Sequence, residues 1–269
     1  MPLRPFCALL AVVLLAASAA PGGDLYDLDA GRELALGGSA LLVGGATWWQ
    51  SRAVAPPTVA ELAALDVADL PAHDRIATRL WSPPAAALSD VLMVGLGLSP
   101  LALLLETGSD LSGGELLAMY AETVALEKSL VGALKLGVGR LRPFTYNPDP
   151  AIPDDLRHSR YARRSFPSGH TGTAFAGAMF TGSVYARLNP DARSRHWVRG
   201  GTLALAALTG YLRVRSGNHF PTDVVAGAAV GALVGWAVPH LHERDRDPLT
   251  PDEIEGRPSG PTLAVHLAF

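Results

Sequence analysis

The sequence predicts an all-α protein, a helical bundle of about six helices that is embedded in a membrane. Hydrophobic residues make up 49% of the 269 residues and charged residues only 17%, against roughly 25% charged in an average soluble protein. In addition, uncharged runs rich in Ala, Leu and Gly extend over 13 to 18 residues, which is too long for ordinary β-strands. The single cysteine, Cys7, excludes a disulfide scaffold, a zinc ribbon and a cysteine redox pair.

The first 20 residues are typical of a secretory signal peptide. Arg4 precedes an apolar stretch over 8–17, and the small residues Ala17-Ser18-Ala19 follow it. This order of a basic, an apolar and a small-residue region predicts cleavage after Ala19 or Ala20. We therefore expect export to the cell envelope, with an uncleaved signal anchor as the alternative.

The remaining apolar runs place the helices and the boundaries. Prolines at 56–57, 83–84, 148–153, 190 and 239 separate the runs or mark their ends. Helices are predicted over 34–50, 91–105, 116–136, 171–186, 200–212 and 224–241. Ser89-Asp90 looks like the N-cap of the helix over 91–105. We divide the chain into an N-terminal segment with one apolar helix (21–84), the helical bundle (85–246) and an acidic surface tail (247–269).

Membrane insertion is favoured by some features of these runs and opposed by others. The runs are shorter than the about 20 residues of a membrane span, and the stretch 116–136 contains charged residues that are costly in lipid. Gly227, Gly231 and Gly235 recur every four residues, a spacing that allows helix backbones to approach closely, as they do in membrane bundles. We expect a bundle in the inner membrane, with a soluble periplasmic bundle as the alternative.

Positive charge is concentrated in one part of the chain. Residues 135–246 contain 15 basic and 7 acidic residues, a net charge of +8, whereas the whole chain has a net charge of −3. The basic residues interrupt apolar runs, and the only lysines are Lys128 and Lys135. This pattern favours binding of a small anion such as phosphate and argues against nucleic acid as a partner.

Three short blocks in this basic part contain residue types that phosphate chemistry requires. The first is a lysine seven residues before an Arg-Pro pair, the second is Pro-Ser-Gly-His, and the third is an arginine followed by a histidine and an aspartate. In chain order, the candidate site residues are Lys135 and Arg142, then Ser168, Gly169 and His170, and then Arg213, His219 and Asp223.

The first group of candidates binds the phosphate. Lys135, Arg142 and Arg213 offer charge-assisted hydrogen bonds, and a guanidinium can bind two phosphoryl oxygens at once. Ser168 offers a hydroxyl and Gly169 an unobstructed backbone N–H, both at the start of a predicted helix, where the helix dipole favours anions.

The second group carries out the reaction. His219 is expected to be the nucleophile, and Asp223, four residues later, its orienting partner. His170 is the candidate general acid and then the base that activates water. We predict no metal and no other cofactor, because the cationic cage itself can stabilise the transition state. The other histidines have no such neighbours and are expected at the surface or an interface: His73, His158, His196, His240, His242 and His266.

Taken together and in this order, the motifs Lys-x6-Arg-Pro, Pro-Ser-Gly-His and Arg-x5-His-x3-Asp resemble the signature of the type 2 phosphatidic acid phosphatase and vanadium haloperoxidase superfamily. The resemblance covers about residues 90–240 and implies a helical bundle, a histidine nucleophile without metal, and the same eight site residues. One departure is Leu212, where the family commonly has serine before the arginine of the third block; it puts substrate preference in doubt more than activity.

The motifs and the resemblance predict a phosphoric monoester hydrolase. Its expected substrate is a phosphate monoester or pyrophosphate of an envelope lipid, cleaved through a phospho-histidine intermediate. A soluble periplasmic acid phosphatase of broad specificity, acting on small phosphate esters, is the alternative. A vanadium-dependent haloperoxidase is a third possibility, weakened because such relatives are usually much longer.

Overall fold

The computed structural model describes residues 23–108 and 110–244. The predicted signal peptide (1–20) and the tail (247–269) lie outside the described residues. Within them, the regular secondary structure is helical, which confirms the predicted all-α bundle. Six helices have 16 or more residues: α2 (Ala30–Ser51), α4 (Pro83–Leu98), α5 (Gly113–Val138), α7 (Gly169–Leu188), α8 (Ser194–Arg215) and α9 (Pro221–Leu241).

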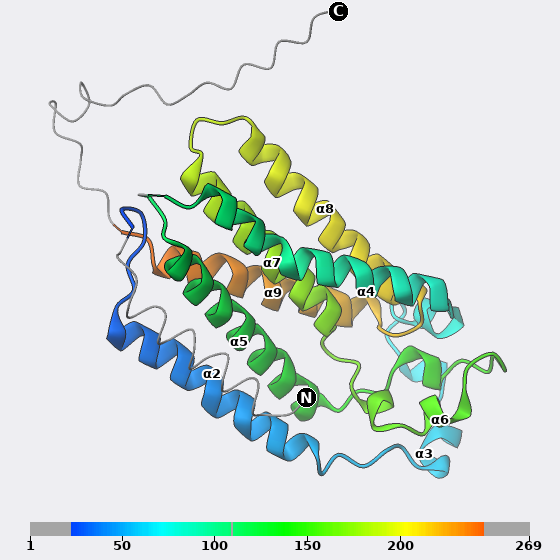
Figure 1. Ribbon diagram of the computed structural model, residues 1–269. Coiled ribbons are helices and arrows are strands. Elements are labelled where there is room, and N and C mark those ends of the chain that lie inside the picture. The colour runs from blue at the N-terminus through cyan, green and yellow to red at the C-terminus, as the bar shows by residue number, and fades with distance from the viewer. Residues whose placement is uncertain (1–22, 109, 245–269) are drawn as a thin grey trace, which may run out of the picture.

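Short helices lie in three of the connections between the long ones. Two are α-helical, α3 (Val59–Ala63) and α6 (Asp154–Arg157). The others are 3₁₀ turns: Val67–Asp69, Arg75–Arg79, Ser99–Glu106, Pro143–Thr145 and Arg160–Arg163. In Figure 1, α3 and α6 lie together at one end of the bundle.

Local signals fix where the long helices begin and end. Ser112 starts α5 with a capping box, because its side chain accepts from the Glu115 backbone N–H and Glu115 reciprocates. Gly139 ends α5 in a left-handed conformation with φ of 58°, which favours glycine. The expected N-cap at Ser89-Asp90 is wrong: α4 begins at Pro83 after the cap Ser82, because proline is well placed in the first turn of a helix.

Helix α7 lies at the centre of the bundle. It packs against α9, α8, α4 and α5, while α2 packs on the other side of α5. In Figure 1, α8 and α2 accordingly lie on opposite flanks. The main hydrophobic core joins α5, α7 and α9 and includes Met119, Phe180 and Val234.

Glycines allow the close packing of α9 on α7. A Cβ at Gly227, Gly231 or Gly235 would lie 2.3, 2.0 or 2.4 Å from a backbone oxygen of α7 or its N-cap. The four-residue glycine spacing seen in the sequence therefore marks a helix contact.

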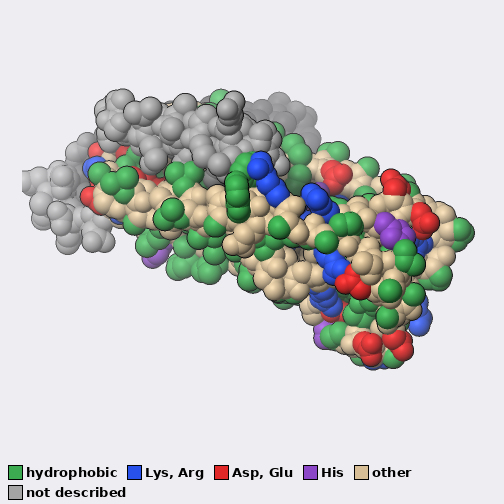
Figure 2. Space-filling view, turned by 90° about the horizontal axis from the view of Figure 1, so that it is seen from below, with side chains coloured by type: hydrophobic (Ala, Val, Ile, Leu, Met, Phe, Trp, Pro, Cys, Tyr) green, Lys and Arg blue, Asp and Glu red, His purple; other side chains and the backbone are tan. Residues whose placement is uncertain are grey.

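Among the described residues, two stretches are long and apolar enough to cross a membrane, Pro83–Glu106 and Pro221–Leu241. Large apolar side chains on them point outward, including Val91 and Val225, which are about two-thirds exposed. Figure 2 shows apolar side chains scattered over the face seen from below, and most basic side chains of this face lie between its middle and one end. These features support association with a membrane.

We predict that Gly231→Ala destabilises the bundle by about 1–3 kcal/mol, because the new methyl group overpacks the contact with Gly172. Gly38→Ala is the control: a Cβ at Gly38, inside α2, meets nothing within 4 Å, and alanine should stabilise the helix by up to about 1 kcal/mol. Thermal unfolding of the purified variants measures both effects. Equal shifts for the two variants would contradict the close α7–α9 contact.

Candidate active site

The three sequence blocks meet at one end of the bundle. Lys135 lies in the last turn of α5 and Arg142 follows that helix. Ser168 to His170 begin α7, and Arg213 lies in the last turn of α8. His219 lies in the loop before α9, and Asp223 in the first turn of α9. The ends of four helices therefore bring together residues that are up to 88 positions apart in the chain.

A cavity of about 230 Å³ lies between these helix ends. Five of the eight predicted residues line it, together with two residues that the motifs did not mark. The lining consists of Lys135, Arg142, Gly169, His170 and His219, with Tyr161 and Arg164. Three basic side chains and two imidazoles around one small cavity form an environment for an anion.

His219 presents one ring nitrogen toward the cationic groups and the other toward Asp223. Its Nε2 lies 3.1 Å from Nη1 of Arg142, which can donate to it. Its Nδ1 lies 3.5 Å from Oδ2 of Asp223 and has no hydrogen-bond partner among the described residues. Burial and the nearby charges of Arg142 and Lys135 hold the pKa of His219 well below its usual value. The imidazole is therefore neutral, the form in which Nε2 has a free electron pair.

Asp223 is held in place by several donors. It is fully buried, and its Oδ2 accepts hydrogen bonds from Ser165 Oγ at 2.5 Å and from the Phe220 backbone N–H at 2.8 Å. Its Oδ1 accepts from Arg140 at 2.9 Å. These contacts fix the carboxylate beside Nδ1 of His219, which favours one orientation of the ring.

Arg140 and Asp74 are part of this support, and the sequence did not identify them. The Arg140 guanidinium bridges Asp223 and Asp74, with the second contact at 2.8 Å. Asp74 also accepts from the backbone N–H and the hydroxyl of Thr222. Arg140 could have been suspected because it lies inside the first motif. No motif in the sequence marked Asp74. It belongs to the N-terminal segment 21–84, so this segment also contacts the site.

Backbone carbonyls position the cations of the cavity. Arg142 donates to the carbonyls of Tyr161, Asn218 and Arg164 at 2.8 to 3.0 Å, and its guanidinium lies 3.7 Å above the Tyr161 ring. Lys135 donates to the carbonyls of Arg164 and Pro167. Because carbonyls are neutral, they fix these groups without cancelling their positive charge.

His170 and Arg213 share a carboxylate partner, Asp90 in α4. Oδ1 of Asp90 lies 2.8 Å from Nε2 of His170 and 3.4 Å from Nη1 of Arg213. Arg213 also donates to Ser89 and to the Tyr161 hydroxyl. Asp90 is thus placed to orient His170, whereas the sequence suggested only a helix cap. The signal available was an acidic residue at the start of an otherwise apolar run.

Ser168 and Gly169 occupy different positions relative to the cavity. The buried Ser168 hydroxyl accepts from the Thr171 backbone N–H and hydroxyl, which makes it the N-cap of α7. It is not among the residues that line the cavity, whereas Gly169 is. Leu212, where the motif departs from the family, does not line the cavity either. The phosphate-binding role of Ser168 stays a prediction.

One histidine differs from the sequence expectation. His242, expected at the surface or an interface, is fully buried. It lies just after α9 and contacts Glu33 and Glu122. The motifs could not reveal this, because both acids come from distant helices.

Part of the sequence matches a known protein family. Residues 116–247 match the PAP2 superfamily. Lipid A 1-phosphatase of Porphyromonas gingivalis is 35% identical over 128 residues, which is 48% of this chain and 24% of that protein. Lipid A 1-phosphatase of Rhizobium etli is 35% identical over 114 residues (42% and 44%), and lipid A 4′-phosphatase of Bacteroides thetaiotaomicron is 34% identical over 103 residues (37% and 41%).

A solved structure, the PAP2-type phosphatidylglycerolphosphate phosphatase of Bacillus subtilis, is 20% identical with a TM-score of 0.48, covering 78% of this chain and 94% of that one. The matched stretches span less than half the length of each of these curated relatives. The match to the PAP2 superfamily covers residues 116–247, slightly less than half of the chain. This confirms the resemblance noted from the three motifs.

We predict that Arg140→Ala lowers the free energy of unfolding by about 3–5 kcal/mol, because two buried carboxylates lose their counter-charge. Arg163→Ala is the matched control: Arg163 pairs with Glu61, which is nearly half exposed, and such a pair contributes about 1 kcal/mol or less. Chemical unfolding measures both variants. An equal loss of unfolding free energy in the two variants would show that the bridge from Arg140 to Asp74 and Asp223 does not stabilise the fold.

Proposed function

We propose that the protein is a metal-independent phosphatase that hydrolyses a phosphate monoester or pyrophosphate of an envelope lipid through a phospho-histidine intermediate. The main support is the neutral, buried His219, whose Nε2 faces a cavity lined by cations. The PAP2 match and the lipid A phosphatases among the relatives support the same reaction class.

In the first step, the phosphate binds among Lys135, Arg142 and Arg213, with the Gly169 backbone N–H as a further donor. Nε2 of His219 attacks phosphorus, a P–N bond forms, and the bond from phosphorus to the ester oxygen breaks. The leaving oxygen takes a proton from His170 and departs as an alcohol. The cations stabilise the negative charge on the three equatorial oxygens in the transition state.

In the second step, water replaces the alcohol. His170, now without its proton, removes a proton from the water, whose oxygen attacks phosphorus. The P–N bond breaks, so that inorganic phosphate leaves and His219 regains its electron pair. Asp223 stabilises the positive charge that the His219 ring carries while it is phosphorylated, and Asp90 keeps His170 in position for both proton transfers.

The position of the cavity supports a lipid substrate. Both candidate membrane spans begin beside it: Pro221–Leu241 starts two residues after His219, and Asp90 lies in the second turn of Pro83–Glu106. If these stretches cross the membrane, the cavity lies near one membrane surface. A lipid headgroup could then enter while its chains stay in the bilayer.

We predict that His219→Ala abolishes turnover of every substrate, because no P–N bond can form. His170→Ala should lower the turnover rate on an alkyl phosphate by about 10²–10⁴-fold, because the leaving oxygen of this substrate needs a proton. On p-nitrophenyl phosphate, where phenolate leaves unaided, phosphoenzyme should accumulate in His170→Ala. Rapid quench with ³²P-labelled substrate measures the acid-labile label.

His240→Ala serves as the control in these assays, because His240 is an exposed residue at the far end of α9. Vanadate should inhibit the wild type, since it mimics the pentavalent transition state. A folded His219→Ala variant that still turns over, or label that resists acid, would exclude the phospho-histidine route.

We predict that the full chain stays in the membrane fraction after alkaline carbonate extraction. It should turn over a long-chain phosphomonoester in mixed micelles at least ten times faster than glycerol phosphate, because the chains add apolar contacts. Phosphate release at matched bulk concentrations measures the ratio. A protein released by carbonate, with equal rates on both substrates, would instead support the soluble periplasmic acid phosphatase.

A further inference from the structure

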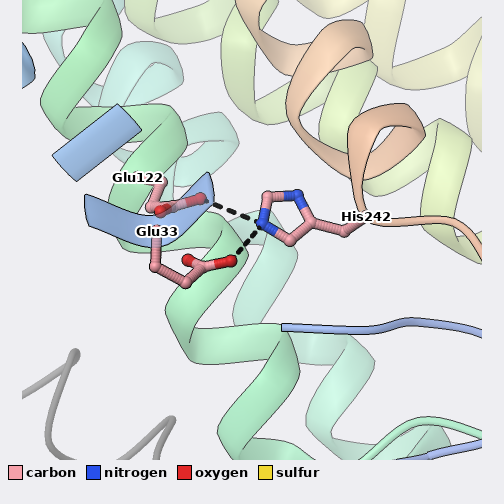
Figure 3. A group of neighbouring side chains, drawn as sticks. All are labelled: Glu33, Glu122 and His242. Carbon is pink, nitrogen blue, oxygen red and sulfur yellow. Dashed lines mark hydrogen bonds and ion pairs between the residues drawn. The ribbon is translucent and has the colours of Figure 1, made fainter. Parts of the chain in front are cut away.

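A second buried polar cluster lies outside the cavity described above. Glu33 comes from the first turn of α2, Glu122 from α5, and His242 from the residue after α9 (Figure 3). Both carboxylates point at the same ring nitrogen: Nε2 of His242 lies 2.8 Å from Glu33 Oε1 and 3.3 Å from Glu122 Oε2. All three residues are buried, with exposed fractions of 6%, 0% and 0%.

The histidine ring is held by its other nitrogen. Nδ1 of His242 lies 2.7 Å from the Val238 carbonyl oxygen. Since a carbonyl can only accept, Nδ1 carries a proton. Nε2, which now donates to Glu33, is the nitrogen that would bind an ion in place of its own proton. A backbone carbonyl that fixes one ring nitrogen while the other acts as ligand is the usual arrangement of metal-binding histidines.

The carboxylates of Glu33 and Glu122 have fewer hydrogen bonds than buried charged groups usually have. Oε2 of Glu33 and both oxygens of Glu122 have no hydrogen-bond partner among the described residues. Arg32 is a nearby cation, but its Nε is 3.9 Å from Glu33 Oε1 and makes no hydrogen bond. Two buried carboxylates need two positive charges, of which a protonated His242 supplies only one, and an uncompensated buried charge is strongly unfavourable.

We propose that Glu33, Glu122 and His242 form a binding site for one divalent metal ion of the Zn²⁺ class. One ligand atom from each residue lies within 4.8 Å of the others, which bonds of about 2.0–2.2 Å to a common ion can span after small side-chain shifts. The charge of two carboxylates matches that of a divalent ion. An imidazole together with carboxylates suits Zn²⁺ better than Mg²⁺ or Ca²⁺.

The ion would connect three helices that are distant in sequence. Helix α2 packs mainly on α5, and the ion would tie its first turn both to α5 and to the chain leaving α9. The proposed role is structural, because none of the three residues lines the cavity of His219. The proposal therefore does not depend on the phosphatase function.

The test uses the full chain, purified and stripped with a chelator, and titrated with Zn²⁺ alone by calorimetry. The wild type should bind one Zn²⁺ at this site, and its unfolding temperature should rise as the ion binds. Glu122→Gln should lower the affinity at least tenfold, since it replaces a charged ligand by a neutral amide. Glu127→Gln is the matched control, because Glu127 is a buried glutamate of the same helix that pairs with Lys128 instead.

A second measurement does not require a variant to fold. Co²⁺ added to the stripped wild type should give a visible absorption band of an ion bound by nitrogen and oxygen, which Zn²⁺ displaces. Failure of the wild type to bind Zn²⁺ or Co²⁺ would overturn the proposal. Protons on the cluster itself would then balance the charge of Glu33 and Glu122. The proposal would also be overturned if folded Glu122→Gln binds Zn²⁺ with unchanged affinity while His219→Ala no longer binds it. The ion would then lie in the cavity of His219.

Discussion

The buried carboxylate of Asp223 is the group on which the rest of the site depends. It accepts from Ser165, from the Phe220 backbone and from Arg140, and so joins the loop before α7, the start of α9 and the segment after α5. The ring of His219 lies against it. A charge this deeply buried is stable only with such partners, so the same contacts that hold the helix ends together also fix the direction of the His219 ring.

The cavity combines like charges that would repel each other without a further partner. Lys135 and Arg142 line it, and Arg213 lies next to it, each held mainly by neutral acceptors, with Asp90 as the acid at the edge. A bound anion would relieve this repulsion. Together with burial, which is the larger cause, these charges lower the pKa of His219. In the proposed mechanism, these charges would both bind phosphate and help to keep His219 unprotonated.

The bundle separates this reactive end from a second polar centre. Helix α9 begins beside the cavity and ends next to His242, where Glu33 and Glu122 complete the other cluster. Between the two, its glycines lie close against α7. The close contact with α7 fixes the position of α9 along its length. The polar groups at both ends of α9, at the cavity and at His242, are thereby held in place.

The sequence by itself determined the helical class, the approximate positions of six helices and a candidate site, because apolar periodicity and short motifs are local properties. The signals that set the ends of the helices, such as Gly139 and the cap Ser168, are local as well. Only the tertiary structure decided that Asp74 and Asp90 support the site and that His242 is buried with two glutamates. These contacts join residues 66 to 209 positions apart, and their partners are chosen by helix packing, which leaves no pattern in the neighbouring sequence.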